Sequence, residues 1–324
     1  MGRYPRFDRS RLRLARLAER GHDLAAAECL PLEAPGVAYE HPEFPHLVER
    51  IAAARGAQRP VILVMGAHPI KLGLARFLVD MIRRRAITHL ALNGAGIIHD
   101  YELATAGGTS ENVARWIREG RFGLWEETGR LNDLAVEAAA AGEGIGERVG
   151  RFLAETEAPF AELSLAAAGW RAAVPVTVHV GIGCDIVHAH PNCDGAAWGQ
   201  ASYADFLIFA RTVEDLEGGV LLNLGTAVMG PEVYLKALSM ARNAAHPQGR
   251  EIRRFTTAVF DLAPLPDDWR QGTPAKSQPL YYYRPWKTIL ERTVADGGTS
   301  FYFRGDHRLT VPTLWAALRE AHFR

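Results

Sequence analysis

The feature that most constrains the fold is the segment 60–102, where two apolar runs each end in a glycine turn that leads into a helical pattern. The first run, 61–65, is rich in β-branched residues and stops abruptly at Gly66. Apolar residues then recur at helical spacing over 72–82, and a second apolar run follows at 87–92. Two strands joined by a helix of this length form a parallel βαβ unit, and ligands bind where such strands end. The segment therefore predicts an α/β fold and the edge of the sheet that carries the chemistry.

The rest of the chain repeats this alternation, which predicts a single doubly wound, mostly parallel α/β domain over residues 59–324. Residues 1–58 are expected to form an N-terminal helical extension, with one helix near 10–20 and another at 45–55. Further elements are predicted as strands at 175–180, 220–225, 255–260 and 301–304, and as helices at 98–119, 131–141, 145–155, 231–244 and 311–321. Residues 107–109 (Gly-Gly-Thr) are a candidate break in the first of these helices.

Composition argues against several classes of function. The 324 residues include 37 basic and 37 acidic side chains, so the zero net charge gives no reason to expect nucleic-acid or membrane-surface binding. Three cysteines without CxxC spacing predict neither a disulfide framework nor a zinc ribbon. The sequence shows no signal peptide and no apolar run approaching the ~20 residues of a membrane span. We therefore expect a cytoplasmic protein, and its Arg- and Ala-rich, Lys-poor composition suggests a bacterial source.

Polar residues follow five of the predicted strands, and the carboxyl ends of parallel strands meet at one edge of a sheet. Glycines in these turns allow backbone N–H groups to approach a phosphate, and helix N-termini favour an anion, so the pattern is typical of a dinucleotide site. The full GxGxxG spacing is absent, because 94–96 and 181–183 each supply GxG alone. The polar residues expected at this edge are His68, Asn93, His99, Asp100, His179, Asp185, Asn223, Thr226, Asp306 and His307.

The densest polar segment is 179–194, which holds three histidines, two aspartates and two cysteines. Imidazole and carboxylate groups are ligands for zinc, iron or manganese, so an alternative function is a metal-assisted hydrolase or lyase. No HExxH or comparable spacing occurs, and the same loop is equally suited to polar contacts with a substrate. The candidate metal ligands under this alternative are His179, Asp185, His188 and His190.

Lys287 is one of four lysines in a chain that otherwise uses arginine, and it follows Trp286. Lysine can lose its proton and form a Schiff base, which arginine cannot do, so Lys287 is a candidate catalytic residue, and its neighbour Trp286 is included with it. The alternative is a surface lysine whose aliphatic stem lies over the tryptophan ring.

The strand-end turns resemble those of the deoxyhypusine synthase family. That family has a strand–TSN–helix unit followed by a strand–TTAGG–helix unit, and segments 66–73 and 93–100 are similar to these at nearly the same spacing. The pair 184–185 resembles the family's Thr-Asp after the central strand, and 301–312 resembles its terminal strand–Ala-Asp–helix segment. The resemblance covers residues 60–320 in order and spacing.

This resemblance implies Rossmann-like subunits that bind NAD at these turns and assemble into a homodimer or homotetramer with sites between subunits. It places Asp306 at the adenosine end of NAD and Asp185 near a ribose. The residues that it implies for NAD binding are Gly66, Ala67, His68, Asn93, Gly94, Ala95, Gly96, Asp100, Asp185, Gly225, Thr226, Gly305 and Asp306.

The catalytic half of the family pattern is less well matched. Trp286-Lys287 approximates a Trp-Gly-Lys whose lysine forms an imine, but it is one residue short. The family's glycine-rich loop followed by Lys-His-His is here 225–231, without the histidine, and the acid-rich loop that grips a polyamine has no clear counterpart. The general base is expected among three histidines: His99, His188 and His190.

The leading hypothesis is therefore an NAD-binding enzyme that performs NAD-dependent dehydrogenation or aminoalkyl transfer on an amine-type small molecule, rather than deoxyhypusine synthesis itself. Besides the metal-assisted alternative, a catalytically degenerate paralogue that binds a nucleotide without turnover would give the same pattern of strand-end turns.

Overall fold

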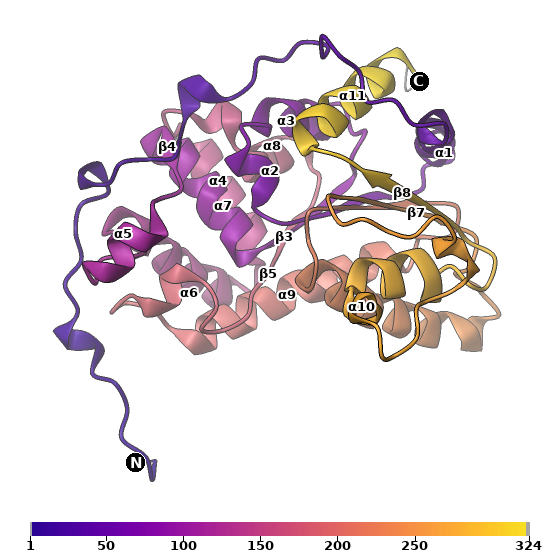
Figure 1. Ribbon diagram of the computed structural model, residues 1–324. Helices are drawn as coiled ribbons and strands as arrows, with labels where there is room; N and C mark the ends of the chain where they lie inside the picture. Colours follow the sequence, from indigo (N-terminus) through magenta and orange to yellow (C-terminus); the bar gives the residue numbers. More distant parts are fainter. Residues whose placement is uncertain (1, 322–324) are drawn as a thin grey trace.

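All six strands of the central sheet run parallel in the computed structural model, which describes residues 2–321. Figure 1 shows the sheet with helices on both of its faces. The order of the strands across the sheet is β5-β3-β2-β6-β7-β8. Counted along the chain, this is the order 3-2-1-4-5-6 of doubly wound dinucleotide-binding folds. The predicted fold class is thus confirmed. The strands are β2 (Val61–Met65), β3 (His89–Asn93), β5 (Val176–His179), β6 (Val220–Leu224), β7 (Thr256–Asp261) and β8 (Thr299–Arg304).

The strand order reverses between β2 and β6, which are hydrogen-bonded neighbours from Val61↔Val220 to Met65↔Leu224. From this pair the chain winds outward in both directions, so the helices that follow β2 and β6 leave the sheet on opposite faces. Ligands of such sheets bind in the crevice at this switch point, outside the carboxyl ends of the strands. The fold therefore directs attention to the turns after Met65 and Leu224.

Alternating side chains of β2 divide the core into two apolar layers. Val61, Leu63 and Met65 belong to one layer, and Ile62 and Val64 belong to the other. The first layer is covered by α1 (Phe44–Gly56), α3 (Ala75–Arg83), α4 (Gly94–Ala106), α6 (Arg130–Ala141), α7 (Ile145–Glu155), α8 (Leu165–Ala172) and α11 (His307–Glu320). The second is covered by α9 (Gly195–Val213), α10 (Met229–Ala245) and the π-helical segment η10 (Pro285–Arg292).

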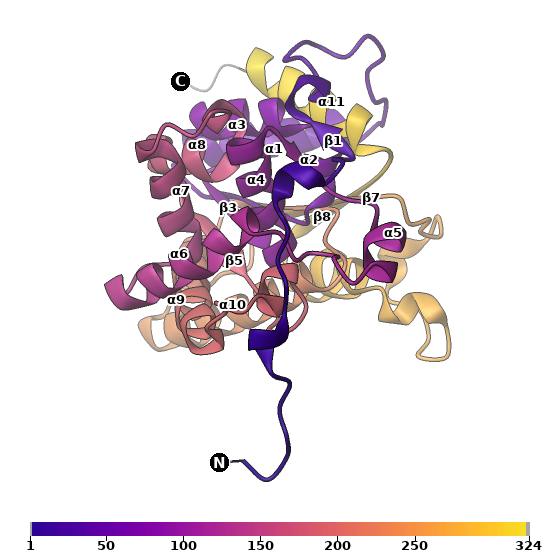
Figure 2. The ribbon, with the colours of Figure 1, turned by 90° about the vertical axis from the view of Figure 1, so that its left-hand side faces the viewer.

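The N-terminal segment crosses the edge of the sheet where the strands end, as Figure 2 shows. The helix expected near 10–20 is wrong, because these residues form only 3-10 turns at Arg9–Arg11 and Leu17–Glu19. Tertiary contacts hold the backbone extended there: Leu17 packs in a small apolar cluster with two tryptophans. Farther on, β1 (Leu24–Ala25) pairs with β4 (Gly108–Thr109) in a two-stranded antiparallel sheet.

The helical region expected over 98–119 is interrupted at the candidate break, because α4 ends in a left-handed Gly107 (φ 68°) and a separate α5 (Val113–Arg118) follows β4. Three other elements differ from the sequence prediction. Helix α8 and the π-helical segment were not expected, and a four-residue helix, α2 (His68–Lys71), precedes α3. Within residues 2–321, no helix has both the length and the apolar character needed to cross a membrane.

Candidate active site

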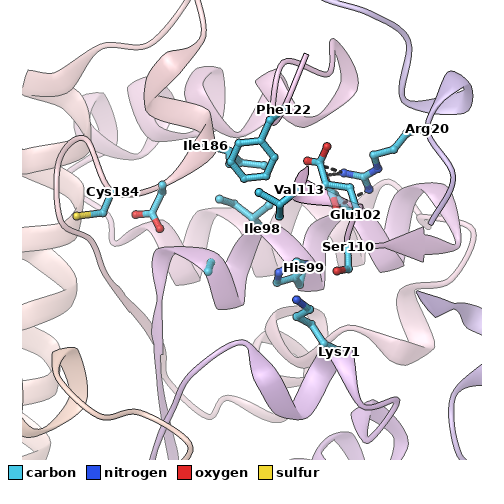
Figure 3. A pocket seen from close by; sticks show the side chains of 13 residues that line it. Arg20, Lys71, Ile98, His99, Glu102, Ser110, Val113, Phe122, Cys184 and Ile186 are labelled. Carbon is cyan, nitrogen blue, oxygen red and sulfur yellow. Dashed lines mark hydrogen bonds and ion pairs between the residues drawn. The ribbon is translucent and has the colours of Figure 1, made fainter. Parts of the chain in front are cut away.

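A cavity of about 250 Å³ lies beside α4, at the edge where the parallel strands end (Figure 3). The segments that follow β2, β3 and β5 build one side of it, and the N-terminal segment and the β4–α5 region build the other. Its lining residues are Arg20, Lys71, Ala95, Ile98, His99, Glu102, Ser110, Glu111, Val113, Phe122, Cys184, Asp185 and Ile186.

One imidazole in this cavity is oriented by a buried ion pair. The Arg20 guanidinium donates to both Glu102 carboxylate oxygens, at 3.1 and 2.8 Å, and both side chains are 1 % exposed. Thr109 gives the single hydrogen of its hydroxyl to Glu102 at 2.7 Å. Its oxygen must therefore accept from His99 Nδ1, which lies 2.7 Å away. This fixes the tautomer of His99 and leaves its Nε2 unprotonated, as a proton acceptor requires.

The ionisation states of these hydrogen-bonded side chains follow from their surroundings. Burial by itself raises the pKa of Glu102, but the hydrogen bonds and charge of Arg20 outweigh burial and hold this pKa below its usual range. Burial lowers the pKa of His99 to about 4. At neutral pH these side chains therefore comprise the charged Arg20–Glu102 pair, the Thr109 hydroxyl and a neutral imidazole. Figure 3 shows the Lys71 side chain pointing toward His99.

Two carboxylates of the cavity keep an oxygen without a hydrogen-bond partner among residues 2–321: Asp185 Oδ2 and Glu111 Oε2. Their side chains are 10 % and 5 % exposed. Burial raises the pKa of Asp185 to about 6, and it also raises the pKa of Glu111. The other Glu111 oxygen accepts from Trp125 Nε1 at 3.0 Å. Buried, unsatisfied carboxylate oxygens are costly in isolation, so these two positions suit N–H or O–H donors of a ligand.

Asp185 occupies the space directly beside the first turn of α4. A Cβ built on Gly94 would lie 2.1 Å from Asp185 Oδ2, so glycine is what allows the carboxylate to approach the helix N-terminus. Asn93 caps this helix, because its side chain accepts from the Gly96 N–H at 2.8 Å. The turn after β3 thus brings a carboxylate and a helix N-terminus together.

The turns at the switch point touch one another. A Cβ on Gly66 would lie 2.4 Å from the backbone oxygen of Gly225, and Gly225 itself has a positive φ of 62°. A Cβ on Gly225 would approach His307 Nε2 to 3.0 Å, so the turn before α11 converges on the same place. Thr226 accepts from the Gly230 N–H at 3.0 Å and so supports the start of α10.

The other residues expected for NAD binding differ in how open they are to a ligand. Ala67 precedes α2, and His68 is exposed at the switch point. Asp306 caps α11, and its pKa is lowered by hydrogen bonding to Arg308. Gly305 lies beneath the ring of Tyr39, which a Cβ there would approach to 2.8 Å, so part of the expected surface is covered by the N-terminal segment.

Asp100 does not lie at the strand-end edge, which corrects the sequence prediction. It is 1 % exposed, and its carboxylate accepts from the Ser164 hydroxyl and from the N–H groups of Leu165 and Ala166. These contacts cap α8. The helical rotation of α4 turns residue 100 into the core, whereas His99 faces the cavity.

The alternative metal centre is also corrected, because among residues 2–321 no three His, Cys, Asp or Glu side chains are arranged to hold a metal ion. His179 Nε2 lies 3.0 Å from Thr177 Oγ1, and His190 Nε2 donates to the Gly123 carbonyl at 2.7 Å. His188 Nδ1 lies 3.3 Å from two backbone N–H groups. Of the four predicted ligands, Asp185 is the one that lines the cavity.

The Trp286-Lys287 pair belongs to η10, on the opposite face of the sheet from α4. Trp286 is a core residue, 2 % exposed, and donates to the Trp269 carbonyl, so its predicted catalytic role is corrected. The Lys287 ammonium lies 3.8 Å from the centre of the Tyr281 ring. It does not line the cavity that holds His99.

Sequence reasoning missed five residues of the candidate site, and one signal was available for them. Glu102 lies three positions after His99 in a helix whose inward residues are mostly apolar, and an acid at such a position needs a buried partner. That partner comes from a segment 82 residues earlier, which no local pattern reveals. The missed residues are Arg20, Lys71, Glu102, Thr109 and Glu111.

No family model and no curated protein matches this chain. Solved structures similar to it include a candidate LOR/SDH protein from Methanococcus maripaludis S2, with TM-score 0.49, 14% identity and coverage of 89% of this chain and 74% of that one. ArgZ, an arginine dihydrolase of the ornithine–ammonia cycle in cyanobacteria, has TM-score 0.48 and 14% identity over 87% of this chain. This chain spans 33% of ArgZ. A candidate deoxyhypusine synthase from Entamoeba histolytica has TM-score 0.44 and 9% identity over 84% of this chain and 87% of that one.

Proposed function

We propose that this chain is an NAD-binding enzyme that dehydrogenates a small amine-type substrate. The observation that carries the proposal is the sheet order, with its switch point between β2 and β6, together with the contact of Gly66 and Gly225 at that point. Dinucleotides bind at this place in doubly wound folds. The cavity beside α4 adjoins the same edge and supplies the substrate-binding half.

The residues present suit NAD in two respects. Crowded glycine turns let backbone groups approach a ligand closely, and the unpartnered Oδ2 of Asp185 can accept from a ribose hydroxyl. Helix α2 has four residues and carries Pro69, which lacks an N–H, so it does not supply the phosphate-binding helix start of the common fingerprint. The residues that would hold NAD are His68, Asn93, Asp185, Gly225 and Thr226.

The cavity chemistry favours an amino group on the substrate. Glu111 offers the unpartnered carboxylate oxygen Oε2, and a protonated amine supplies the charge-assisted donors that satisfy such an atom. NAD supplies a hydride acceptor when bound. Oxidation of an amine carbon releases one hydride and one proton, and we assign the proton to His99 Nε2, which the Thr109 contact leaves as an acceptor. The resulting imidazolium is stabilised by Glu102 through the Thr109 hydroxyl.

Calorimetric titration with NAD⁺ tests the cofactor half. We expect saturable binding by the wild type and about tenfold weaker binding by His68→Ala, the loss of ~1.4 kcal/mol of contact energy. His246→Ala is the matched control, because His246 is also exposed but follows α10, away from the strand-end turns. Absence of binding by the wild type up to ~1 mM NAD⁺, equivalent to about −4 kcal/mol, would reject the cofactor.

Turnover tests the substrate half. Wild-type protein is mixed with NAD⁺ and a panel of primary amines and amino acids, and reduced nicotinamide is followed by its absorbance. His99→Gln is expected to lower the rate by about 10²- to 10⁴-fold, the usual contribution of a general base, while it leaves NAD⁺ affinity unchanged. Binding of NAD⁺ without turnover of any amine would instead identify a nucleotide-binding paralogue without this activity.

A further inference from the structure

A chain of four polar side chains runs through the apolar layer between the sheet and α9. His179 Nε2 lies 3.0 Å from Thr177 Oγ1, which lies 3.0 Å from His89 Nε2. His89 Nδ1 in turn lies 2.8 Å from Thr212 Oγ1 on α9. Exposure is 5 % for His179, 1 % for Thr177 and 0 % for His89. The chain therefore links the carboxyl end of β5 to the covering helix without reaching the cavity beside α4.

The surroundings of this chain are apolar, so its polar atoms must satisfy one another. Phe209 packs edge-on against both imidazoles, with ring centroids 5.4 Å from each. Burial lowers the pKa of His89 to about 3 and that of His179 to about 4, so both rings are neutral at physiological pH. Each neutral ring carries one N–H and one lone pair, and each threonine hydroxyl carries one hydrogen.

These constraints leave two arrangements of hydrogens along the chain, and in both of them the two histidines hold opposite tautomers. Thr212 selects between the two, because its hydroxyl also lies 3.4 Å from the Ile208 carbonyl and donates to it. Its oxygen then accepts from His89 Nδ1. Thr177 consequently donates to His89 Nε2 and accepts from His179 Nε2, so His179 Nδ1 carries a lone pair.

This lone pair belongs to a residue at the switch-point edge. His179 lines a small cavity of about 10 Å³ together with Asn93, Thr226 and Met229, beside the start of α10. That volume accommodates one water molecule or one polar group of a ligand. Within residues 2–321, the hydrogen bond of the His179 ring is the one between Nε2 and Thr177 Oγ1.

We propose that His179 is a ligand-contacting residue, whose Nδ1 accepts a hydrogen bond from an uncharged N–H group, that of a primary carboxamide, bound at the strand-end edge. The side chains of Thr177, His89 and Thr212 act as positioning residues that fix its tautomer. A neutral acceptor at this place distinguishes a carboxamide, which donates, from a carboxylate, which cannot. The use of NAD⁺ as a probe below rests on the proposed function, but the tautomer assignment does not.

Long-range ¹H–¹⁵N spectra of histidine-labelled protein read the tautomers directly. At neutral pH we expect His89 protonated on Nδ1 and His179 protonated on Nε2. Thr177→Val keeps the side-chain shape but removes the link, so His179 is expected to populate both tautomers. Thr156→Val, which removes an exposed hydroxyl on a helix end, is expected to change neither ring. The same tautomer at both histidines, or a charged ring at either, would overturn the assignment.

Ligand contact is tested by adding NAD⁺, ADP-ribose, acetamide or acetate to the same sample. NAD⁺ and acetamide carry a carboxamide and are expected to shift the His179 Nδ1 resonance, whereas ADP-ribose and acetate are expected to leave it unchanged. In Thr177→Val, NAD⁺ affinity should fall about five- to tenfold, toward that of ADP-ribose. Failure of NAD⁺ to bind, with acetamide still shifting Nδ1, rejects the proposed cofactor alone. Absence of any shift with either carboxamide overturns the role of His179.

Discussion

Replacement of Arg20 by methionine tests the buried ion pair that orients His99. The variant leaves the Glu102 carboxylate, 1 % exposed, without its cation. Two unit charges ~4 Å apart attract by about 4 kcal/mol at an effective dielectric constant of ~20, and removal of one partner of a buried pair typically costs about 3–5 kcal/mol. We therefore expect Arg20→Met to lower the free energy of unfolding by about 4 kcal/mol near pH 8.

The pH dependence of this loss is the sharper test. In the wild type the pKa of Glu102 is depressed, so its contribution is present above the unfolded pKa of about 4.3 and is lost as pH falls through the folded pKa. Without Arg20, burial alone raises the Glu102 pKa above the unfolded value, and stability then falls as pH rises from about 4.3. The difference between variant and wild type should thus widen from about pH 5 to about pH 8.

Urea denaturation followed by far-ultraviolet circular dichroism at several pH values measures both quantities. Arg16→Met is the matched control, because the Arg16–Glu126 pair is exposed, at 71 % and 46 %, and such pairs contribute about 0–1 kcal/mol. The double variant Arg20→Met/Glu102→Gln should recover part of the loss, since no buried charge remains. An Arg20→Met cost below ~1 kcal/mol, or one that does not change with pH, would refute the reasoning.

Three further predictions concern other buried groups. Gly66→Ala should destabilise the protein by ~2 kcal/mol or more in thermal or urea unfolding, because the added Cβ would meet a backbone oxygen at 2.4 Å. Gly94→Ala should cost less, because its Cβ meets a carboxylate that can move. Gly199→Ala, which has open space around it, should not destabilise the protein. Burial raises the pKa of Asp205 to about 8, so the contribution of this side chain to stability is lost as pH rises through that value. Asp205→Asn should therefore be more stable than the wild type by ~1–3 kcal/mol at pH 8. The same stability difference between variant and wild type at pH 5 would contradict this. Proton NMR of His99 should show a titration midpoint near 4. Because this pKa is depressed, the free energy of unfolding should fall as pH drops below about 6.5. A midpoint near 6.5 would show that burial does not hold the ring neutral.

The sheet was largely predictable from the sequence because each buried strand is a short apolar run that ends at a turn residue. This signal is local, and β2, β3, β5, β6, β7 and β8 all carry it. The order of the strands was not predictable, because pairing depends on crossovers that the local pattern does not encode. The prediction of a helix near residues 10–20 was wrong for a similar reason. Packing of Leu17 and pairing of β1 with β4 override the helical spacing of that segment.

The candidate site was predictable only where a strand end supplies it. Asp185 and His99 follow β5 and β3, so their proximity could be inferred from the fold class. Arg20 and Glu111 come from segments whose position depends on tertiary contacts. Lys287 was chosen for its rarity among residue types, which is a statement about composition, and the structure places its ammonium against an aromatic ring. The rarity of a residue type does not indicate where its side chain lies in the fold, whereas a position at the end of a strand does.

The route of the N-terminal segment makes the orientation of His99 depend on a part of the chain that lies far from the sheet in sequence. The sheet, its crossover helices and most of both apolar layers are formed by residues from Phe44 onward, and Arg20 belongs to neither layer. The buried carboxylate of Glu102 on α4 accepts from Arg20, from Thr109 on β4 and from Thr128, so segments far apart in the sequence meet at one side chain. A population of molecules with native helix content can therefore still lack an oriented His99. The tautomer of His99, rather than a measure of secondary structure, therefore reports whether the N-terminal segment is in place.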